Sequence, residues 1–444
     1  MNPELLSLIG IILSVFVFVY GVFKGIHIVA STLLGVVIVA LFSGSNIMQS
    51  ITKVWAPKFG GTCQAYFLIF FFSALFARAL GDTGAANAIA FKLAKLSRMW
   101  PGHEKLMAVL CVVIMQSVFT YFGVSVFVVT FTVMYIAKEL FTELDVPWRL
   151  YTCGALGTST FTTGMLPGSP QLTNLIPMEY FGTDPTAAPV LGIVCSLVVI
   201  AFGLWWINFS VKKAEAKNEG FLPSGEALLA SWDESKNVKA VDLPLWKCLV
   251  GPIVLFIVMN VIKLDPIIAM LAGTVATYLV FNPIKQKDKI KPSIFTSISN
   301  AAGPLIALAA ASGFGGVVAA APGFGYVISA LESIPGPPAI QVAVSVNVAA
   351  AFSASSSTGL RLTLDMLAER FMSTGIPAAA LHRLSSIVSV CLDDLPHSPG
   401  LANAYYLTKI SYKDGYINNF MISIVGTFIT MAVAIVLISL GLTF

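Results

Sequence analysis

Long apolar runs separated by short polar joints dominate this sequence. A helix that crosses a bilayer needs about 20 mainly apolar residues. Ten runs approach that length, so the pattern predicts an all-α polytopic membrane protein. These runs cover roughly residues 5–22, 26–43, 63–82, 151–166, 188–210, 244–263, 265–282, 299–320, 380–394 and 417–442.

Two further apolar stretches, 105–140 and 338–371, carry a polar, glycine-containing tip in the middle. The tips read TYFGVS at 120–125 and SASSSTG at 353–359. Backbone that leaves the helix at membrane depth is tolerated only where it is buried or lines a cavity. We therefore expect each stretch to be a re-entrant helical hairpin, although two full spans would fit the same pattern.

The charge-rich segment 211–243 divides the chain almost in half, and the two halves repeat each other. Residues 166–174 read LPGSPQLTN and residues 395–403 read LPHSPGLAN, with six of nine positions identical. Duplicated halves with broken helices in matching places are typical of transporters. We expect two inverted repeats, each of about five spans plus a hairpin. They comprise 1–210, with a broken helix at about 151–176, and 244–444, with a broken helix at about 380–405.

Composition and charge support this organisation. The 444 residues are 57% hydrophobic and only 11% charged, against about 25% in soluble domains. This excludes a soluble enzyme, a disordered chain and a nucleic-acid binder. The six cysteines are scattered and form no CxxC motif, so neither a disulfide framework, a metal site nor a cofactor is expected.

Most of the positive charge falls on one predicted side of the membrane. Of 26 Lys and Arg residues, 19 lie in loops that this topology assigns to the same side as segment 211–243. The positive-inside rule makes that side cytoplasmic. The prediction is a multi-pass protein of the inner (plasma) membrane, with a cytoplasmic linker at 211–243 and both termini outside.

The polar residues near the four helix breaks indicate the ligand. A broken helix exposes N–H groups that suit an anion such as a carboxylate. The polar groups near the breaks are mainly hydroxyls and amides with few cations, which fits a small organic anion. Such side chains also often bond back to their own helix, so a structural role is the alternative. The predicted substrate contacts are Tyr121, Ser125, Thr163, Ser169, Gln171, Ser355, Ser356, Ser357 and His397.

Asp393, Asp394 and His397 carry the sharpest functional signal. Ionisable groups at membrane depth are costly and are functional candidates by default. The first half has no acid at the matching place. We therefore assign the coupling ion, H⁺ or Na⁺, to these three residues. In the alternative, His382 or Arg383 neutralises the two aspartates, and they only fix the break.

Two cation–carboxylate pairs at helical i,i+4 spacing, Arg361 with Asp365 and Arg78 with Asp82, are expected to be structural. Arg361 as a clamp for the substrate carboxylate is the alternative. A membrane hydrolase is disfavoured because no nucleophile-elbow or HExxH motif occurs. A passive channel is disfavoured by the asymmetric ionisable groups at the breaks.

The motifs YFGVSVFVV at 121–129, LPGSPQ at 166–171 and LDDLPH at 392–397 resemble those of the gluconate:proton symporter (GntP) family. They are most similar to its hydroxybutyrate permease-like branch. The same motifs add Gly123 and Gly168 to the predicted substrate site. Gluconate permeases carry an acidic residue where Phe122 stands here, which favours a shorter acid.

The resemblance implies secondary active import by an elevator-type mechanism in a homodimer. We therefore expect an ion-coupled symporter of a small monocarboxylate, a short hydroxy- or keto-acid similar to 3-hydroxybutyrate. The alternatives are a gluconate or other sugar-acid:proton symporter, or a cation/proton antiporter of the same architecture.

Overall fold

The computed structural model describes residues 2–24, 26–96, 100–124, 126–232, 243–353, 355–396 and 398–444. Over these residues the regular structure is entirely helical. The first half contains α1 (Pro3–Phe23), α2 (Ile28–Phe42), α3 (Ile47–Gln49), α4 (Ala56–Asp82), α5 (Ala85–Leu96), α6 (Glu104–Tyr121), α7 (Val126–Glu143), α8 (Leu172–Phe181) and α9 (Pro189–Ala216).

Several helices contain irregular turns. In the first half these are a π-helix at Ser50–Trp55, a 3₁₀ segment η3 (Trp148–Gly154) and a π-helix η4 (Leu156–Met165). In the second half two π-helices, Ile257–Val261 and Phe420–Val425, interrupt otherwise α-helical spans. The α-helices from the linker onward are α10 (Glu226–Ala230), α11 (Leu245–Phe256), α12 (Pro266–Val280), α13 (Pro283–Ala320), α14 (Phe324–Glu332), α15 (Pro338–Ser353), α16 (Ser356–Met372), α17 (Ala378–Ser389), α18 (Pro399–Thr408), α19 (Tyr412–Asn419) and α20 (Gly426–Ser439).

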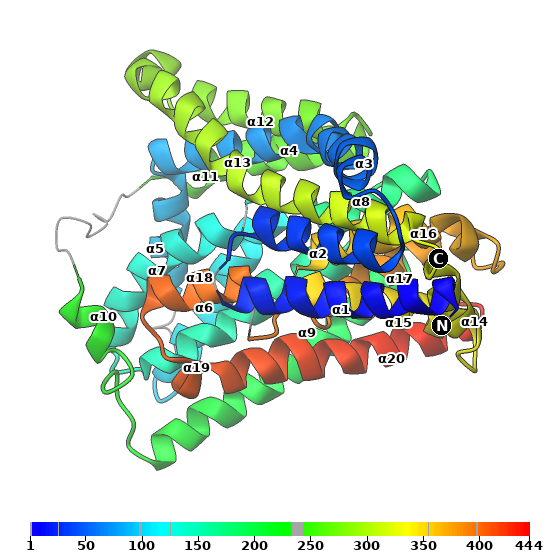
Figure 1. Ribbon diagram of the computed structural model, residues 1–444. Coiled ribbons are helices and arrows are strands. Elements are labelled where there is room, and N and C mark those ends of the chain that lie inside the picture. Colours follow the sequence, from blue (N-terminus) through cyan, green and yellow to red (C-terminus); the bar gives the residue numbers. More distant parts are fainter. Residues whose placement is uncertain are drawn as a thin grey trace.

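The helices form a bundle in which α1 and α20 run in similar directions and α13 is inclined to them (Figure 1). Five helical segments in the described part of the chain are long and apolar enough to cross a bilayer: Ile47–Asp82, Glu104–Tyr121, Pro189–Ala216, Gln286–Ala320 and Tyr412–Ser439. Shorter apolar helices lie among them. The all-α polytopic fold class is thereby confirmed. Both termini lie at one end of the bundle and α10 at the other (Figure 1), and we call these the terminal end and the linker end.

The outer helices do not have the polar outer face and apolar inner face of helices in soluble proteins. Along α1 the large apolar side chains of Ile9, Ile12 and Phe16 are exposed, whereas Ser7 and Ser14 are buried. A helix that keeps large aliphatic groups on its surface and small polar ones inside matches an apolar solvent, because only the buried hydroxyls need partners. Ser14 meets this need by donating to the carbonyl of Ile11 at 2.7 Å.

The two halves have the same order of elements. In the first half, α1, α2, α4 and α5 precede the α6–α7 hairpin, a broken helix (η4 then α8) and α9. In the second half, α11, α12, α13 and α14 precede the α15–α16 hairpin, a broken helix (α17 then α18) and α19–α20. Helix α2 packs on α13, and α12 packs on α4. That the halves are inverted, and that the hairpins are re-entrant, stay predictions.

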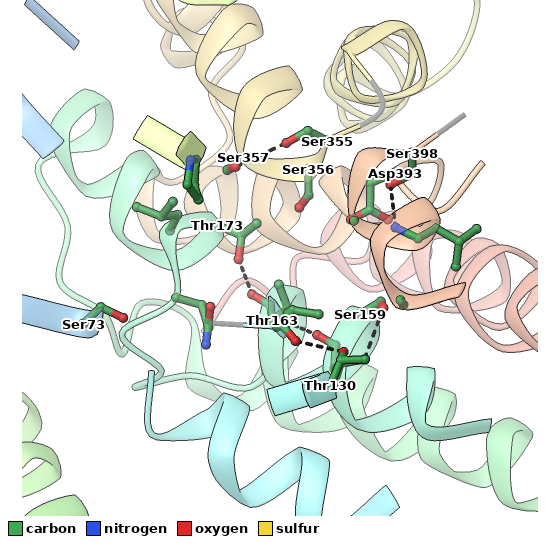
Figure 2. A pocket seen from close by; sticks show the side chains of 18 of the residues that line it. Ser73, Thr130, Ser159, Thr163, Thr173, Ser355, Ser356, Ser357, Asp393 and Ser398 are labelled. Atoms are coloured by element: carbon green, nitrogen blue, oxygen red, sulfur yellow. Dashed lines mark hydrogen bonds between the residues drawn. The ribbon is translucent and has the colours of Figure 1, made fainter. Parts of the chain in front are cut away.

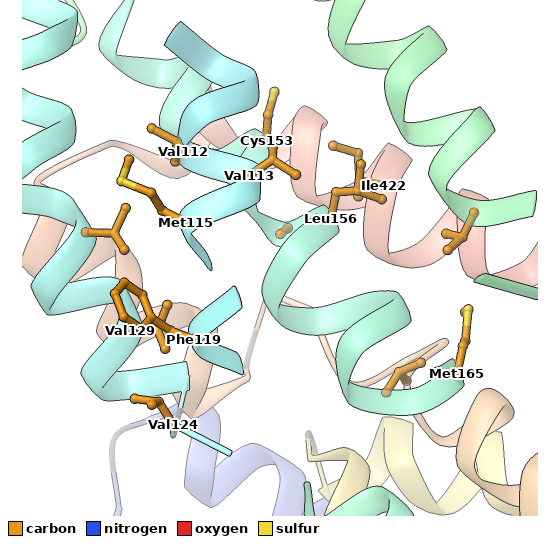
Figure 3. Packing of buried hydrophobic residues seen from close by; sticks show 14 of the residues in the cluster. Val112, Val113, Met115, Phe119, Val124, Val129, Cys153, Leu156, Met165 and Ile422 are labelled. Atoms are coloured by element: carbon orange, nitrogen blue, oxygen red, sulfur yellow. The ribbon is translucent and has the colours of Figure 1, made fainter. Parts of the chain in front are cut away.

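The first hairpin packs against its broken helix through branched and sulfur-containing side chains. Val113 and Met115 of α6 and Leu156 and Met165 of η4 are buried in one cluster, which also includes Ile422 from the end of the chain (Figure 3). Gly157 permits this contact, because a Cβ there would lie 2.6 Å from the carbonyl of Val113. The hairpin, the first break and the last span thus form a single packed unit.

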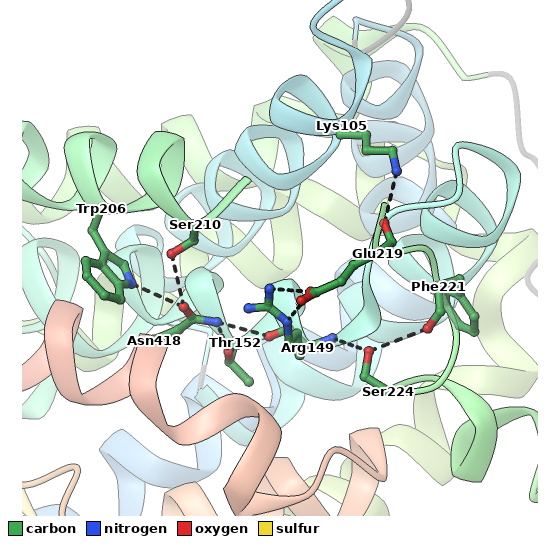
Figure 4. A network of polar contacts seen from close by, with 9 residues as sticks. All are labelled: Lys105, Arg149, Thr152, Trp206, Ser210, Glu219, Phe221, Ser224 and Asn418. Atoms are coloured by element: carbon green, nitrogen blue, oxygen red, sulfur yellow. Dashed lines mark hydrogen bonds and ion pairs between the residues drawn. The ribbon is translucent and has the colours of Figure 1, made fainter. Parts of the chain in front are cut away.

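The first part of the predicted linker folds back onto the linker end (Figure 4). Arg149 of η3 pairs with Glu219 at 2.5 Å, and Lys105 of α6 donates to the Glu219 carbonyl at 3.2 Å. The backbone N–H of Phe221 donates to Asp145 at 2.7 Å. Residues 217–232 therefore dock on the first hairpin and broken helix. Residues 233–242 of the linker lie outside the described part of the chain.

Close packing of the second hairpin generates a stability prediction. A Cβ at Gly359 would lie 2.3 Å from the backbone of Ala350 on the opposite arm. Because backbone cannot move aside cheaply, Gly359→Ala should destabilise the protein by about 1–3 kcal/mol. Thermal unfolding of the purified protein in detergent should show a lower Tm. Gly325→Ala in α14, where a Cβ meets open space, is the matched control and should not lower it.

Candidate functional site

A cavity of about 940 Å³ lies where the broken helices and hairpin tips of both halves meet. Hydroxyl groups dominate its polar lining (Figure 2). Its polar lining residues include Ser73, Arg78, Gln116, Thr130, Thr158, Ser159, Thr163, Gln171, Thr173, Asn300, Ser355, Ser356, Ser357, Thr358, Asp393, Asp394, Ser398, Thr408 and Asn419.

Four helices begin at this cavity. Val126 opens α7, Leu172 opens α8, Ser356 opens α16, and Ser398 precedes α18; all four residues line the cavity. The first N–H groups of a helix have no partner within the helix, and its N-terminus carries roughly half a positive charge. Four such termini around one space create a site that favours an anion.

The sequence at each start explains why a helix begins there. Ser355 is the N-cap of α16, and its hydroxyl accepts from the N–H of Thr358 at 3.4 Å. Ser398 caps α18 in the same way through the N–H of Leu401 at 3.5 Å, with Pro399 at the first helical position. Serine at the cap and proline just inside are favoured at helix N-termini.

Hydrogen bonds to the backbone of Gly168 fix the conformation of the first break. Gly168 has a φ of +81°, a conformation that other residues adopt only with strain. Its N–H donates to the carbonyl of Pro185 at 2.8 Å, and its carbonyl accepts from the amide of Asn260 at 3.0 Å. Asn260 belongs to the second half, so the break is fixed by contacts between the halves.

The first hairpin tip is tied to that break. The side-chain amide of Gln171 donates to the carbonyl of Thr120 at 2.5 Å, and the hydroxyl of Tyr121 donates to the carbonyl of Pro167 at 3.2 Å. Gly123 has a φ of +85°, and a Cβ there would meet the ring of Pro170 at 2.6 Å. The tip and the break are thus positioned together on one side of the cavity.

Asp393 and Asp394 lie just beyond the C-terminal end of α17 and line the cavity. Their exposed fractions are 9% and 8%. The Ser356 hydroxyl lies beside Asp393, and those of Ser159 and Ser423 lie beside Asp394. Oδ1 of Asp393 and Oδ2 of Asp394 have no hydrogen-bond partner among the described residues. Figure 2 shows Ser356 and Asp393 facing the same space.

Arg383 and His382 do not neutralise these aspartates, which corrects the structural alternative considered above. Arg383 is fully buried and donates to the carbonyls of Ala187 and Pro185 at 2.8 and 3.2 Å and to Asn174 Oδ1 at 3.0 Å. His382 contacts the same Asn174 oxygen at 3.0 Å. Both side chains fasten α17 to Asn174 of α8, and Arg383 also binds the carbonyls of the loop that follows α8.

The structure brings together most of the predicted site residues. Gly123, Thr163, Gln171, Ser355, Ser356, Ser357, Asp393 and Asp394 line the cavity. Tyr121, Gly168 and Ser169 are not among the lining residues. Ser169 is fully buried and accepts from the N–H of Gln171 at 3.4 Å. Ser125 and His397 lie outside the described residues. Phe122 is not in the lining, so its effect on acid size stays a prediction.

Sequence reasoning missed lining residues that lie within continuous spans. Ser73 of α4 donates to the carbonyl of Gly123 at 2.7 Å, and Thr130 and Gln116 belong to the hairpin arms. Arg78 also reaches the cavity, with the expected Asp82 partner at 3.1 Å. A polar residue in an apolar span was the available signal, but it does not reveal which way the side chain points.

An apolar helical bundle with broken helices meeting at a polar cavity is the architecture of a membrane transporter. Comparison with known proteins agrees: residues 5–369 match the GntP family permease, and the chain belongs to this family of permeases. It is similar to a protein of Bacillus subtilis (strain 168) described as an uncharacterized transporter, YxjC. The two share 28% identity over 471 aligned positions, which cover 96% of this chain and 98% of that protein.

The buried guanidinium at the first break can be tested directly. In Arg383→Lys a single ammonium cannot make all the contacts that the planar guanidinium makes with three oxygens, among them the two to the buried Ala187 carbonyl. We expect a loss of about 2 kcal/mol in stability and a lower Tm in detergent. Lys413→Arg, the reverse exchange at an exposed position of α19, should change the Tm little. An unchanged Tm in Arg383→Lys would show that the contacts do not fasten α17 to α8.

Proposed function

We propose that this protein is an ion-coupled symporter that imports a small monocarboxylate, such as a short hydroxy- or keto-acid of the 3-hydroxybutyrate type. The convergence of four helix N-termini on one hydroxyl-rich cavity is the observation that carries this proposal. A carboxylate placed there receives N–H donors and positive helix ends, while the serine and threonine hydroxyls suit a hydroxyl or carbonyl group of the acid.

Within this proposal the carboxylate binds at the start of α16, near Ser355, Ser356 and Ser357. This terminus has the longest run of hydroxyls and heads a helix of 17 residues. The start of α8 beside Gln171 faces it from the first half. Thr163, Gly123, Tyr121, Gly168 and Ser169 complete the proposed substrate site, either in the lining or by holding the first tip and break. The sequence motifs add Ser125 and His397, which lie outside the described residues.

Coupling follows from placing two carboxylates beside an anion site. At an effective dielectric constant near 20, like charges about 7 Å apart repel by about 2 kcal/mol. Asp393 and Asp394 would therefore exclude an anionic substrate unless a cation or proton neutralises them. Cotransport of H⁺ or Na⁺ at these residues, with His397 as a further proton carrier, would make binding of the acid depend on the ion.

A sugar acid such as gluconate is the second candidate substrate. The cavity volume of about 940 Å³ exceeds what a four-carbon acid fills, and the many hydroxyls of the lining could bind a polyol chain. The preference for a short acid depends on the family resemblance, in which an apolar Phe122 replaces an acidic residue. Uptake assays must therefore compare both classes.

The same proposal includes the predicted architecture. The matching order of elements supports two inverted repeats, and the position of both termini opposite α10 supports a cytoplasmic linker with both termini outside. The protein would act as a homodimer in the inner (plasma) membrane. A cation/proton antiporter of this architecture remains the alternative to symport.

Coupling is testable with Asp394→Asn in proteoliposomes. Uptake of labelled 3-hydroxybutyrate, lactate and gluconate is measured under an imposed H⁺ or Na⁺ gradient. The variant should lose gradient-driven accumulation, because a neutral amide does not require the ion. Asp265→Asn, an exposed N-cap of α12 that Asn replaces well, should accumulate acid normally. Normal accumulation by Asp394→Asn at every pH would refute this role, and proton release by Na⁺ without any acid would favour the antiporter.

The substrate position is testable with Ser356→Ala. Loss of a hydroxyl at the start of α16 should raise the KM for the transported acid about tenfold, as expected for one hydrogen bond to a charged group. Ser329→Ala on the exposed face of α14 is the control. An unchanged KM in Ser356→Ala would place the carboxylate elsewhere in the cavity.

A further inference from the structure

A second polar cluster lies away from the cavity and contains four charged side chains. It joins two long helices, α4 and α13, to the two helices that start at the substrate cavity, α8 and α16. We name it the Arg361 cluster. Its members are Lys58 and Tyr66 of α4, Ser312 of α13, Glu179 and Tyr180 of α8, and Arg361 and Asp365 of α16.

One part of the cluster is centred on Arg361. Its Nη1 donates to Glu179 Oε2 at 2.5 Å and to the Tyr66 hydroxyl at 2.7 Å, and that hydroxyl donates to Glu179 at 2.8 Å. The guanidinium also lies over the rings of Tyr66 and Tyr180, at 5.2 and 5.1 Å from their centroids. Tyr66 is thus the link from this ion pair to α4.

The other part is centred on Asp365. Tyr180 donates to its Oδ1 at 2.7 Å, and Ser312 donates to its Oδ2 at 3.0 Å. Lys58 Nζ lies 3.8 Å from Oδ1, and Arg361 Nε lies 3.4 Å from Oδ2. The cluster is electrically balanced, with two cations and two carboxylates. The i,i+4 pair expected from the sequence is present, but it is one contact in a larger network.

The cluster lies on the opposite side of the cavity from the linker end. Arg361 comes five residues after Ser356, so it lies about 7 Å farther along α16, and α16 runs toward the terminal end (Figure 1). The cavity lining instead continues toward the linker end, through Thr408 and Asn419. The Thr408 carbonyl accepts from Trp148, whose ring packs on Phe221 of the linker.

We propose that the Arg361 cluster is the closed gate at the terminal end of the transport pathway. Alternating access requires one group of helices to move against another. The contacts that must break are those from Tyr66, Lys58 and Ser312 to α8 and α16. The Arg361–Glu179 and Tyr180–Asp365 contacts lie within the α8–α16 pair and can persist. This inference rests on transport as the class of activity and not on the identity of the acid.

Two features suit this interface to repeated opening. The side chains of Lys58 and Glu179 are 50% and 49% exposed, so their contacts with α16 and α4 lie at the edge of the interface and are not enclosed within it. Gly315 of α13 lets α16 approach closely: a Cβ there would lie 1.7 Å from Cδ1 and 3.9 Å from Cβ of Leu362. A small residue at such a crossing lets helices pack closely.

The 3.9 Å separation allows the gate to be locked. Paired cysteines form disulfides when their Cβ atoms lie about 3.5–4.5 Å apart, so Gly315→Cys with Leu362→Cys should cross-link α13 to α16. The reporter is Val126→Cys, which lines the cavity, in a Cys63→Ala background; the other native cysteines are buried. An impermeant maleimide is applied from each side of the membrane, without any organic acid.

The expected result is that oxidation abolishes labelling from the terminal side and preserves labelling from the linker side. Reduction of the same sample should restore both, which controls for damage by the substitutions. Labelling from the terminal side that continues in the fully cross-linked protein would overturn the proposal. Because no substrate is used, this result is independent of whether a monocarboxylate is the cargo.

A double substitution that removes hydroxyl groups without cross-linking the helices tests the cluster itself. Tyr66→Phe with Ser312→Ala removes three hydroxyl contacts across the interface and leaves every ion pair in place. Terminal-side labelling should rise about fivefold, the population shift produced by losing about one net hydrogen bond. Tyr326→Phe with Ser329→Ala on α14 is the matched control and should leave labelling unchanged. Equal labelling of the two double variants would show that the cluster is static packing and not a gate.

Discussion

The structure depends on one constraint: backbone groups cannot remain unpaired at membrane depth unless they line a cavity or bind a ligand. Four helices begin inside this bundle, at α7, α8, α16 and α18. Their free N–H groups are partly capped by Ser355 and Ser398. The remainder face a shared polar space, and an anion is the ligand that satisfies them. The cavity, its hydroxyl lining and the contacts that fix the breaks all follow from this requirement.

The same constraint explains the unequal halves. Positive helix ends come from both halves, whereas the buried carboxylates Asp393 and Asp394 occur only in the second. A bound anion and two ionised carboxylates in one cavity repel one another strongly. Family membership establishes a permease. Ion coupling is the proposal that reconciles these opposite electrostatic demands. The Arg361 cluster adds a charge-balanced contact at the end of α8 and in the middle of α16, the two helices that start at the site.

Much of the fold was predictable because a helix that spans a bilayer must have a minimum length and a mainly apolar composition. The apolar runs located most of the long helices, although the runs 63–82 and 299–320 began well inside the segments Ile47–Asp82 and Gln286–Ala320. The glycine–serine tips fall between α6 and α7 and between α15 and α16. The family was predictable from the motifs around Gly123, Gly168 and Asp394. By contrast, α5 and α14 escaped prediction because they are short and join longer elements.

Side-chain direction was the main information that the sequence lacked. Arg383 lies ten residues before Asp393 and was considered as its partner, yet it reaches the first half, because the carbonyls of Pro185 and Ala187 are closer in space. Arg361 was paired with Asp365 by spacing alone, whereas Glu179 and Tyr66 come from distant segments. Ser73 and Arg78 looked like ordinary span residues. Contacts between the halves decide the two arginine cases, a contact with the first hairpin tip involves Ser73, and periodicity carries no information about either.

The central claim is that the acid binds where the four helix N-termini meet. The most direct measurement is an experimental structure of the full-length protein with the transported acid at saturating concentration. Binding as proposed gives density for the carboxylate at the start of α16, within hydrogen-bond distance of its first N–H groups and the Ser356 hydroxyl. Density for the acid outside this cavity, with the four helix starts solvated by water alone, would contradict it.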